Sequence, residues 1–380
     1  MELTNITSEC SNSSSNCTMT VFRCGIPPFL PPTVPEVFHY IQGGIWTIFF
    51  FCSLFLNGFV IFLVLTYSTL HHREFFLTLQ LNVTHFIFSL TILPTMISNA
   101  FAGHCLYGFP LCQVIGVFHD LYITGKFFLT LVMTLDRFFI IFMPYFYYKH
   151  GGVISALMST TAWLISLIRV TTLFTGPLDC YTYLPLFKVC TGAGTCSRAC
   201  QIHVLMFSTS LAVFCMVLPF VIYIVLFCKA RKMEGKMKHS LHNPLAIDTE
   251  NNNFTLKSDS SQPNNKPSFL LRHKRVFTTF LILAVALIGC AIPPYILYAL
   301  SFIVSRDILL HPAFSVIQML IGRTLIYSLS VIDPLIIMRN KDVKDLLQKL
   351  WRRRKEKRRY SVSTSHKTNR IPDSVSSDSK

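Results

Sequence analysis

Long apolar stretches dominate the chain and are separated by short polar or charged segments. Each stretch provides roughly the 20 mostly apolar residues that a helix needs to cross the hydrocarbon core of a bilayer. A helix also satisfies every backbone N–H and C=O group within the segment, as the membrane interior requires. The pattern therefore predicts seven transmembrane helices, at residues 44–67, 74–99, 110–142, 153–174, 202–228, 270–303 and 312–338.

Composition and charge agree with a membrane protein. Only 14% of the residues are charged, whereas a soluble domain carries about 25%. The net charge of +16 does not indicate nucleic-acid binding, because 26 of the 34 Lys and Arg residues lie in segments that seven helices place on one side of the membrane. Basic segments stay in the cytoplasm. We therefore expect a multi-pass membrane protein with an outward-facing N-terminus and a cytoplasmic C-terminus.

The predicted outer segments have the features of an oxidising compartment. Residues 1–43 form a Ser-rich extracellular tail with N-glycosylation sequons at Asn5, Asn12 and Asn16. Nine of the 13 cysteines lie in the outer segments. Disulfide bonds are the expected use of cysteines there, and a zinc or other metal site is not expected.

The predicted cytoplasmic segments are polar or basic. Residues 233–268 interrupt the 44–338 bundle as a loop without periodicity, which predicts disorder. Residues 339–351 have apolar positions at helical spacing, which predicts a short amphipathic helix on the anionic inner leaflet. The tail at 352–380 is basic and Ser-rich, and Ser361 is a candidate phosphorylation site whose phosphate would weaken attraction to lipid.

Several motifs in fixed order resemble the rhodopsin-like G protein-coupled receptors over nearly the whole chain. They are Leu56-Asn57-Gly58, Cys112, Asp136-Arg137-Phe138, Phe142-Met143-Pro144-Tyr145, Trp163, Pro219, Pro293 and Asp333-Pro334. The resemblance implies an all-α bundle of seven transmembrane helices that senses an extracellular small-molecule ligand and activates a heterotrimeric G protein. It also implies a receptor kinase and arrestin as further partners, and no cofactor.

Other stretches resemble odorant receptors. They are Leu70-His71 with the following Phe75-Phe76-Leu77, and Arg339-Asn340-Lys341-Asp342-Val343-Lys344 after the last helix. Residues 133–140 read MTLDRFFI, and the third cytoplasmic loop is long; both features depart from the odorant pattern. The resemblance to odorant receptors implies an odorant-like ligand; an anionic ligand is the other expectation and rests on Arg323, described below.

The resemblance assigns G-protein coupling to Asp136, Arg137, Phe138 and Pro144. A guanidinium at the cytoplasmic end of a helix can be held by an adjacent carboxylate at rest and released to a partner when helices separate. The alternative is an Arg that only snorkels at the membrane edge.

The resemblance also implies a disulfide between Cys112 and the loop that joins the fourth and fifth helices. Cys190 is the preferred partner and Cys180 is the alternative. Such a bond would fasten this outer loop to the third helix.

Charged side chains inside the bundle are rare and informative. Where the family usually binds a sodium ion, this chain has His85 and Lys126, and only Asp333 is acidic. We expect the Lys126 ammonium to replace the metal and to pair with Asp333, close to a neutral His85. The alternative is that Lys126 snorkels into water. A second pair, Asp120 with Arg169, is expected between the third and fourth helices.

The resemblance places a ligand cavity at the outer end of the bundle. Arg323 suits a carboxylate, phosphate or sulfate because its planar fork makes bidentate bonds. The competing interpretation is an ion pair with Asp307. The candidate ligand-binding residues are His119, Ile123, Tyr295, Tyr298, Arg323 and Tyr327.

Two other functions, a transporter and a non-signalling decoy receptor, remain as alternatives. A transporter could use Lys126, His85 and Asp333 as an ion or proton path, but paired broken helices are not found. A non-signalling decoy receptor is motivated by Phe227 and Ile337, which stand where the family has tyrosines. Enzymatic activity is not expected, because no nucleophile elbow, phosphate loop or zinc motif occurs.

Overall fold

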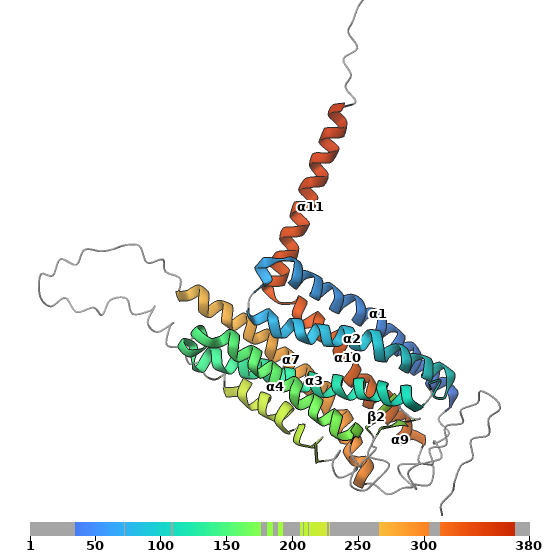
Figure 1. Ribbon diagram of the computed structural model, residues 1–380. Helices are drawn as coiled ribbons and strands as arrows, with labels where there is room; N and C mark the ends of the chain where they lie inside the picture. The colour runs from blue at the N-terminus through green and yellow to red at the C-terminus, as the bar shows by residue number, and fades with distance from the viewer. Residues whose placement is uncertain are drawn as a thin grey trace, which may run out of the picture.

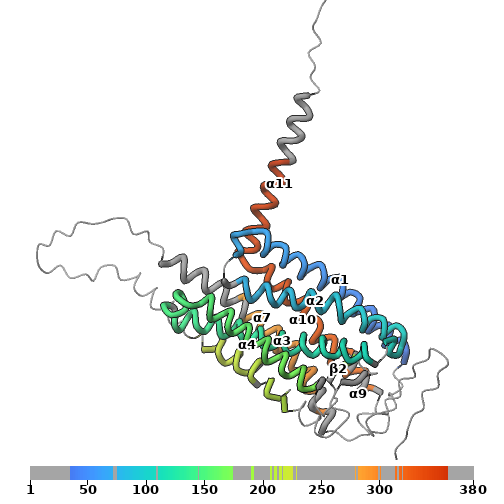
Figure 2. Tube along the Cα trace, in the orientation of Figure 1, coloured from blue at the N-terminus to red at the C-terminus, as the bar shows by residue number. Residues whose placement is uncertain are grey.

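The computed structural model describes residues 35–71, 73–107, 109–175, 181–184, 189–192, 206–207, 209–211, 213–225, 228, 266–303 and 312–368. These form the helical bundle of a seven-transmembrane protein, as predicted (Figure 1). Figure 2 traces the chain in the same orientation. The elements are α1 (Glu36–Thr66), η2 (Ser68–Leu70), α2 (Arg73–Ala102), α3 (Phe109–Phe142), α4 (Pro144–Thr175), η3 (Val213–Val217), α7 (Lys266–Ile303), α9 (Pro312–Ile317), η4 (Gln318–Arg323), α10 (Thr324–Met338) and α11 (Lys341–Thr368).

Four helical stretches of the described chain are long and apolar enough to cross a membrane, namely Glu36–Thr66, Phe75–Ala102, Tyr145–Leu173 and Leu320–Met338. Helix α3 has the length but carries Asp120, Lys126, Asp136 and Arg137. All four side chains are buried within the protein. Since a charge is costly to expose to lipid, their burial explains how α3 can occupy the centre of the bundle.

Proline 334 shapes α10 and creates a demand for hydrogen bonds. Because proline has no N–H, the carbonyl of Ser330 loses its usual helical partner. Two side chains of α1 replace it: the Ser53 hydroxyl donates at 3.1 Å and the Asn57 amide donates at 2.8 Å. Ser89 of α2 donates to the Ser53 hydroxyl at 2.7 Å. Helix α10 is therefore fastened to α1 and α2 through the carbonyl of Ser330.

Helices α3 and α4 approach closely at a glycine. A Cβ at Gly125 would lie 2.8 Å from the ring of Trp163. Only glycine leaves the indole room to pack against the α3 backbone. This contact explains why a tryptophan in the fourth span suits the fold.

A two-stranded antiparallel sheet lies at one end of the bundle, which we call the hairpin end. Strands β1 (Tyr181–Leu184) and β2 (Val189–Gly192) pair with Tyr183 opposite Cys190. The Cys112–Cys190 disulfide, with Cα atoms 5.4 Å apart, joins β2 to α3 and confirms the preferred partner. The opposite end carries Arg137 and is called the Arg137 end.

Helix α11 is longer than the 339–351 segment that the sequence predicts. It runs to Thr368 and points away from the Arg137 end of the bundle (Figure 1). Val343 and Leu346 are buried in a cluster with Val60 and Leu63 of α1. The apolar periodicity ends near Trp351, but the following Lys, Arg and Glu residues are good helix formers and extend the helix. The predicted loop at 233–268 lies almost entirely outside the described residues.

Candidate functional site

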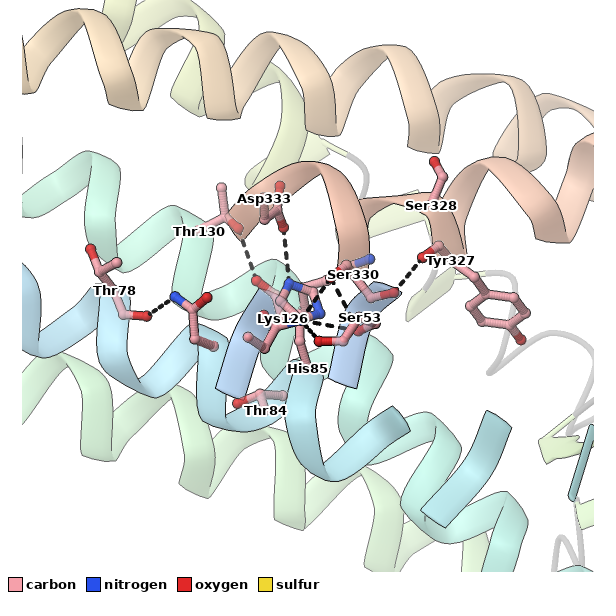
Figure 3. A network of polar contacts seen from close by, with 12 residues as sticks. Ser53, Thr78, Thr84, His85, Lys126, Thr130, Tyr327, Ser328, Ser330 and Asp333 are labelled. Atoms are coloured by element: carbon pink, nitrogen blue, oxygen red, sulfur yellow. Dashed lines mark hydrogen bonds and ion pairs between the residues drawn. The ribbon is translucent and has the colours of Figure 1, made fainter. Parts of the chain in front are cut away.

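Three ionisable side chains from three helices meet in the middle of the bundle (Figure 3). His85, Lys126 and Asp333 are all buried. His85 Nε2 lies 3.0 Å from Asp333 Oδ2, and His85 Nδ1 lies 3.0 Å from the hydroxyl of Tyr122. An ionised carboxylate can only accept, so Nε2 carries a proton and Nδ1 accepts from Tyr122 when the ring is neutral. A neutral His85 therefore satisfies both contacts.

The predicted ion pair between Lys126 and Asp333 is wrong, because His85 takes the position beside the carboxylate. Lys126 Nζ instead donates to the backbone carbonyl of Ile326 at 3.2 Å. It also lies 5.4 Å and 5.6 Å from the ring centroids of Tyr122 and Phe127, within range of cation–π attraction. The three groups share one cluster as expected, but the direct partner of Asp333 is the imidazole.

A second buried cluster lies closer to the hairpin end. His119 Nε2 is 2.7 Å from the hydroxyl of Tyr327, and its Nδ1 is 3.3 Å from Asp120 Oδ1. The hydroxyl of Thr191 on β2 donates to the same Asp120 oxygen at 2.7 Å. The hairpin is thus joined to α3 by a side-chain hydrogen bond as well as by the disulfide.

Aromatic rings connect the two clusters. Phe88 stacks on Tyr122 with centroids 3.9 Å apart and lies 5.3 Å from the ring of Tyr327. Trp46 meets Tyr327 edge-on at 6.2 Å. These rings are buried and form a contiguous packed contact between His119 and His85.

The structure brings together some of the predicted ligand-binding residues. His119 and Tyr327 contact each other, and Ile123 packs against Tyr327 and its neighbours. The guanidinium of Arg323 hydrogen-bonds the hydroxyl of Tyr327. The hydroxyl of Tyr295 donates to Thr209 at 3.0 Å. The side chain of Tyr298 lies outside the described residues, as does Asp307.

The predicted pair of Asp120 with Arg169 is also wrong as a direct contact. Asp120 bonds to His119 and Thr191, while Arg169 Nη1 donates to the hydroxyl of Thr124 at 2.7 Å. The hydroxyl of Thr191 on β2 and the imidazole of His119 on α3 are the groups that contact Asp120 directly. Arg169 instead joins α4 to α3 through the buried hydroxyl of Thr124.

At the Arg137 end, a carboxylate joins α3 to α4. Asp136 Oδ2 lies 3.4 Å from Arg137 Nη2, so the ion pair that the sequence predicts is present. Asp136 Oδ1 accepts hydrogen bonds from the hydroxyls of Tyr147 and, at 2.6 Å, Ser155. Phe138 stacks on Phe142 with centroids 4.6 Å apart. The role of these residues in coupling stays a prediction.

Sequence reasoning missed several members of these clusters. Tyr147 was not found because the fourth helix was expected to begin at 153, whereas it begins at Pro144. Ser155 lies within the predicted helix, but its contact with Asp136 depends on the rotation of that helix. Proline is favoured at the first helical position, and this signal could have extended the helix. Tyr223 was also missed: it is buried and hydrogen-bonds the side chain of Thr134, one turn from Arg137.

A third sulfur lies beside the disulfide. Cys105 carries a thiol, and the sulfur atoms of Cys105, Cys112 and Cys190 lie within 4.8 Å of one another. The predicted glycosylation sites Asn5, Asn12 and Asn16 and the side chain of Ser361 lie outside the described residues.

We expect Cys112→Ala to reduce surface delivery less than the double replacement of Cys105 and Cys112. The single variant leaves Cys190 beside Cys105, which can form a substitute bond, whereas loss of every bond costs about 2–5 kcal/mol in small domains. Surface labelling of an epitope-tagged receptor measures the difference, with Cys105→Ala alone as the control. Equal delivery of the single and double variants would contradict this expectation.

Comparisons with known proteins agree with this architecture. A family model described as 7 transmembrane receptor (rhodopsin family) matches residues 56–336. Olfactory receptor 2AT4 of Homo sapiens is 25% identical over 138 residues, which are 36% of this chain and 43% of that receptor. The chain therefore matches less than half the length of that relative. The crystal structure of squid rhodopsin has a TM-score of 0.67 at 16% identity and covers 83% of this chain and 86% of its own, a likeness of fold.

Proposed function

We propose, because this chain belongs to the rhodopsin family of seven-transmembrane receptors, that it senses an extracellular small molecule and activates a heterotrimeric G protein. The observation that carries the proposal is the Asp136–Arg137 pair, buried on α3 and held by two hydroxyls of α4. A ligand that prefers the arrangement with this pair opened would shift the population toward it. When such a pair opens, its guanidinium can bind a partner protein at this end of the bundle.

The charge distribution supports placing the Arg137 end in the cytoplasm of a plasma-membrane protein. Residues 352–357 of α11 are exposed and mostly basic, and α11 leaves the bundle at this end. Basic segments favour the cytoplasmic, anionic face of the membrane. The N-terminal tail with its sequons is then extracellular, and the tail with Ser361 is accessible to a receptor kinase and arrestin.

Tyr223 favours a signalling receptor over the decoy. The decoy alternative rests on missing tyrosines at Phe227 and Ile337. Tyr223 lies four residues before Phe227 in the sequence, and its buried side chain hydrogen-bonds Thr134 of α3. A hydroxyl that can bond across the helices is therefore present near Arg137.

The ligand that fits best carries an anionic group. Arg323 lies at the end of η4, close to the Tyr327–His119 contact. A guanidinium binds carboxylate, sulfate or phosphate in a bidentate manner. The adjacent imidazole and phenol supply further hydrogen-bonding atoms, and the rings of the aromatic cluster suit an apolar body.

We expect anionic agonists to lose about tenfold or more in potency in Arg323→Gln, the effect of losing a charge-assisted hydrogen bond. Reporter cells tested with a panel of carboxylic, sulfonic and phosphonic acids, each beside its neutral ester, measure this. Arg323→Lys is the matched control, since it keeps the charge without the fork and should lose less. An acid agonist with unchanged potency against Arg323→Gln would remove this residue from the site.

Sodium is expected not to stabilise the wild-type receptor. The Lys126 ammonium lies in the cluster of His85 and Asp333 and repels a second cation. The measurement is the thermal unfolding midpoint of the purified receptor in sodium chloride and in choline chloride at equal ionic strength. Sodium should raise the unfolding midpoint only in Lys126→Ser. A clear rise in the wild type would show that the Lys126 ammonium does not prevent sodium from binding.

A further inference from the structure

A shallow recess on the outside of the bundle is lined mainly by apolar side chains and by one charged side chain, that of Arg169. It has a volume of about 290 Å³ and is lined by Ile165, Ile168, Arg169, Thr172 and Phe207. Ile165 and Ile168 are 40% and 62% exposed, so this face of α4 turns toward the surrounding lipid. The recess therefore opens toward lipid, whereas the polar clusters are buried inside the bundle.

Arg169 is incompletely satisfied by the protein. Its Nη1 donates to Thr124, and its guanidinium carbon lies 4.2 Å from the ring centroid of Phe207. Its Nε is buried without a hydrogen-bond partner. No carboxylate of the described chain forms an ion pair with it within 4.0 Å; Asp120, which contacts His119 and Thr191, acts on the guanidinium only from a longer distance.

A charge at this depth favours an anionic ligand. Arg169 precedes the end of the apolar span, Leu173, by four residues, or about 6 Å of helix. This is the depth at which the head of a membrane amphiphile meets the edge of the hydrocarbon. A guanidinium without a carboxylate in direct contact is costly in such surroundings, and a ligand carboxylate can accept charge-assisted hydrogen bonds from the N–H groups that the protein leaves free.

We propose that this recess binds the carboxylate of a long-chain fatty acid from the surrounding bilayer. The guanidinium of Arg169 holds the head, and the isoleucines and Phe207 contact the first part of the chain. The small volume suits a single acyl chain with a compact head better than a two-chain phospholipid. The site is separate from the proposed ligand site around Arg323, and its occupancy does not depend on G-protein activation.

The test is the binding of radiolabelled oleate to the purified full-length receptor in phosphatidylcholine nanodiscs. We expect saturable binding above that of empty discs, weakened about tenfold or more in Arg169→Gln, the equivalent of a lost charge-assisted bond. Lys149→Gln, on the exposed opposite end of the same helix, is the matched control and should bind as the wild type does. Oleyl alcohol, which has the chain but no charge, should not compete.

A second variant protects the test from misfolding. Ile168→Trp fills the recess without touching the bond from Arg169 to Thr124, and it should also abolish oleate binding while the thermal unfolding midpoint stays near that of the wild type. Wild-type affinity in either variant, equal competition by oleyl alcohol, or no saturable binding to the wild type would overturn the proposal. Displacement of oleate by phosphatidylglycerol built into the disc at equal concentration would overturn it in favour of a phospholipid headgroup.

Discussion

Replacing His85 by alanine is expected to lower the free energy of unfolding by about 3–5 kcal/mol, the cost of leaving a buried carboxylate without its partner. The imidazole is fully buried and contacts both Asp333 and Tyr122 at 3.0 Å. Without it, the carboxylate of Asp333 loses its only direct side-chain partner among the described residues. The nearby Lys126 ammonium can offset part of this loss, which places the expected value toward the lower end.

Unfolding of the purified protein by SDS in mixed micelles measures this effect. The double variant His85→Ala with Asp333→Ala removes both partners, so its loss should be smaller than the sum of the two single losses, by about 0.5–3 kcal/mol for residues in contact. Strictly additive losses, or a His85→Ala variant as stable as the wild type, would show that the imidazole–carboxylate contact does not stabilise the bundle.

Replacing Asp136 by asparagine is expected to raise basal signalling, and adding Arg137→Ala should abolish the rise. Asparagine keeps the shape but removes the charge that holds the guanidinium at 3.4 Å. The freed guanidinium of Arg137 can then contact the G protein. Removing this guanidinium in Arg137→Ala should reduce signalling by about tenfold or more. Reporter cells that express each variant at matched surface density measure the effect.

Tyr147→Phe is the graded control for this prediction. It removes one of the two hydroxyl donors to Asp136 but leaves the charge and Ser155 in place, so its basal signal should lie between those of the wild type and Asp136→Asn. A signal from the Asp136→Asn, Arg137→Ala double variant equal to that of Asp136→Asn alone would separate Arg137 from coupling.

The fold could be predicted from the sequence, because it follows from short-range patterns. Apolar stretches of fixed length predict the helices, and a charge inside such a stretch must turn toward the bundle interior. The grouping of Lys126, His85 and Asp333 came from the resemblance to the rhodopsin-like receptors, which assigns these positions to one site. The direct contacts could not be predicted, since they depend on helix rotation and on which side chain is short enough to fill the space beside Asp333.

Two errors have a common physical cause. The fourth helix begins nine residues earlier than its apolar pattern, at Pro144 rather than 153, and α11 continues beyond its apolar pattern to Thr368. Hydropathy marks the part of a helix that meets lipid or core, whereas caps and intrinsic helix propensity decide where the helix ends. Tyr147 lies in such an extension, so its contact with Asp136 could not be predicted from the apolar pattern.

We expect the Arg137 end to catalyse nucleotide exchange on a G protein. The most direct measurement uses the receptor in nanodiscs mixed with purified heterotrimers, one from each G-protein class, and records the rate at which each heterotrimer binds a non-hydrolysable GTP analogue. We predict that Asp136→Asn accelerates loading of at least one heterotrimer and that the double variant with Arg137→Ala does not. Loading that no variant changes, with every class of heterotrimer and with folded receptor in the disc, would contradict the claim.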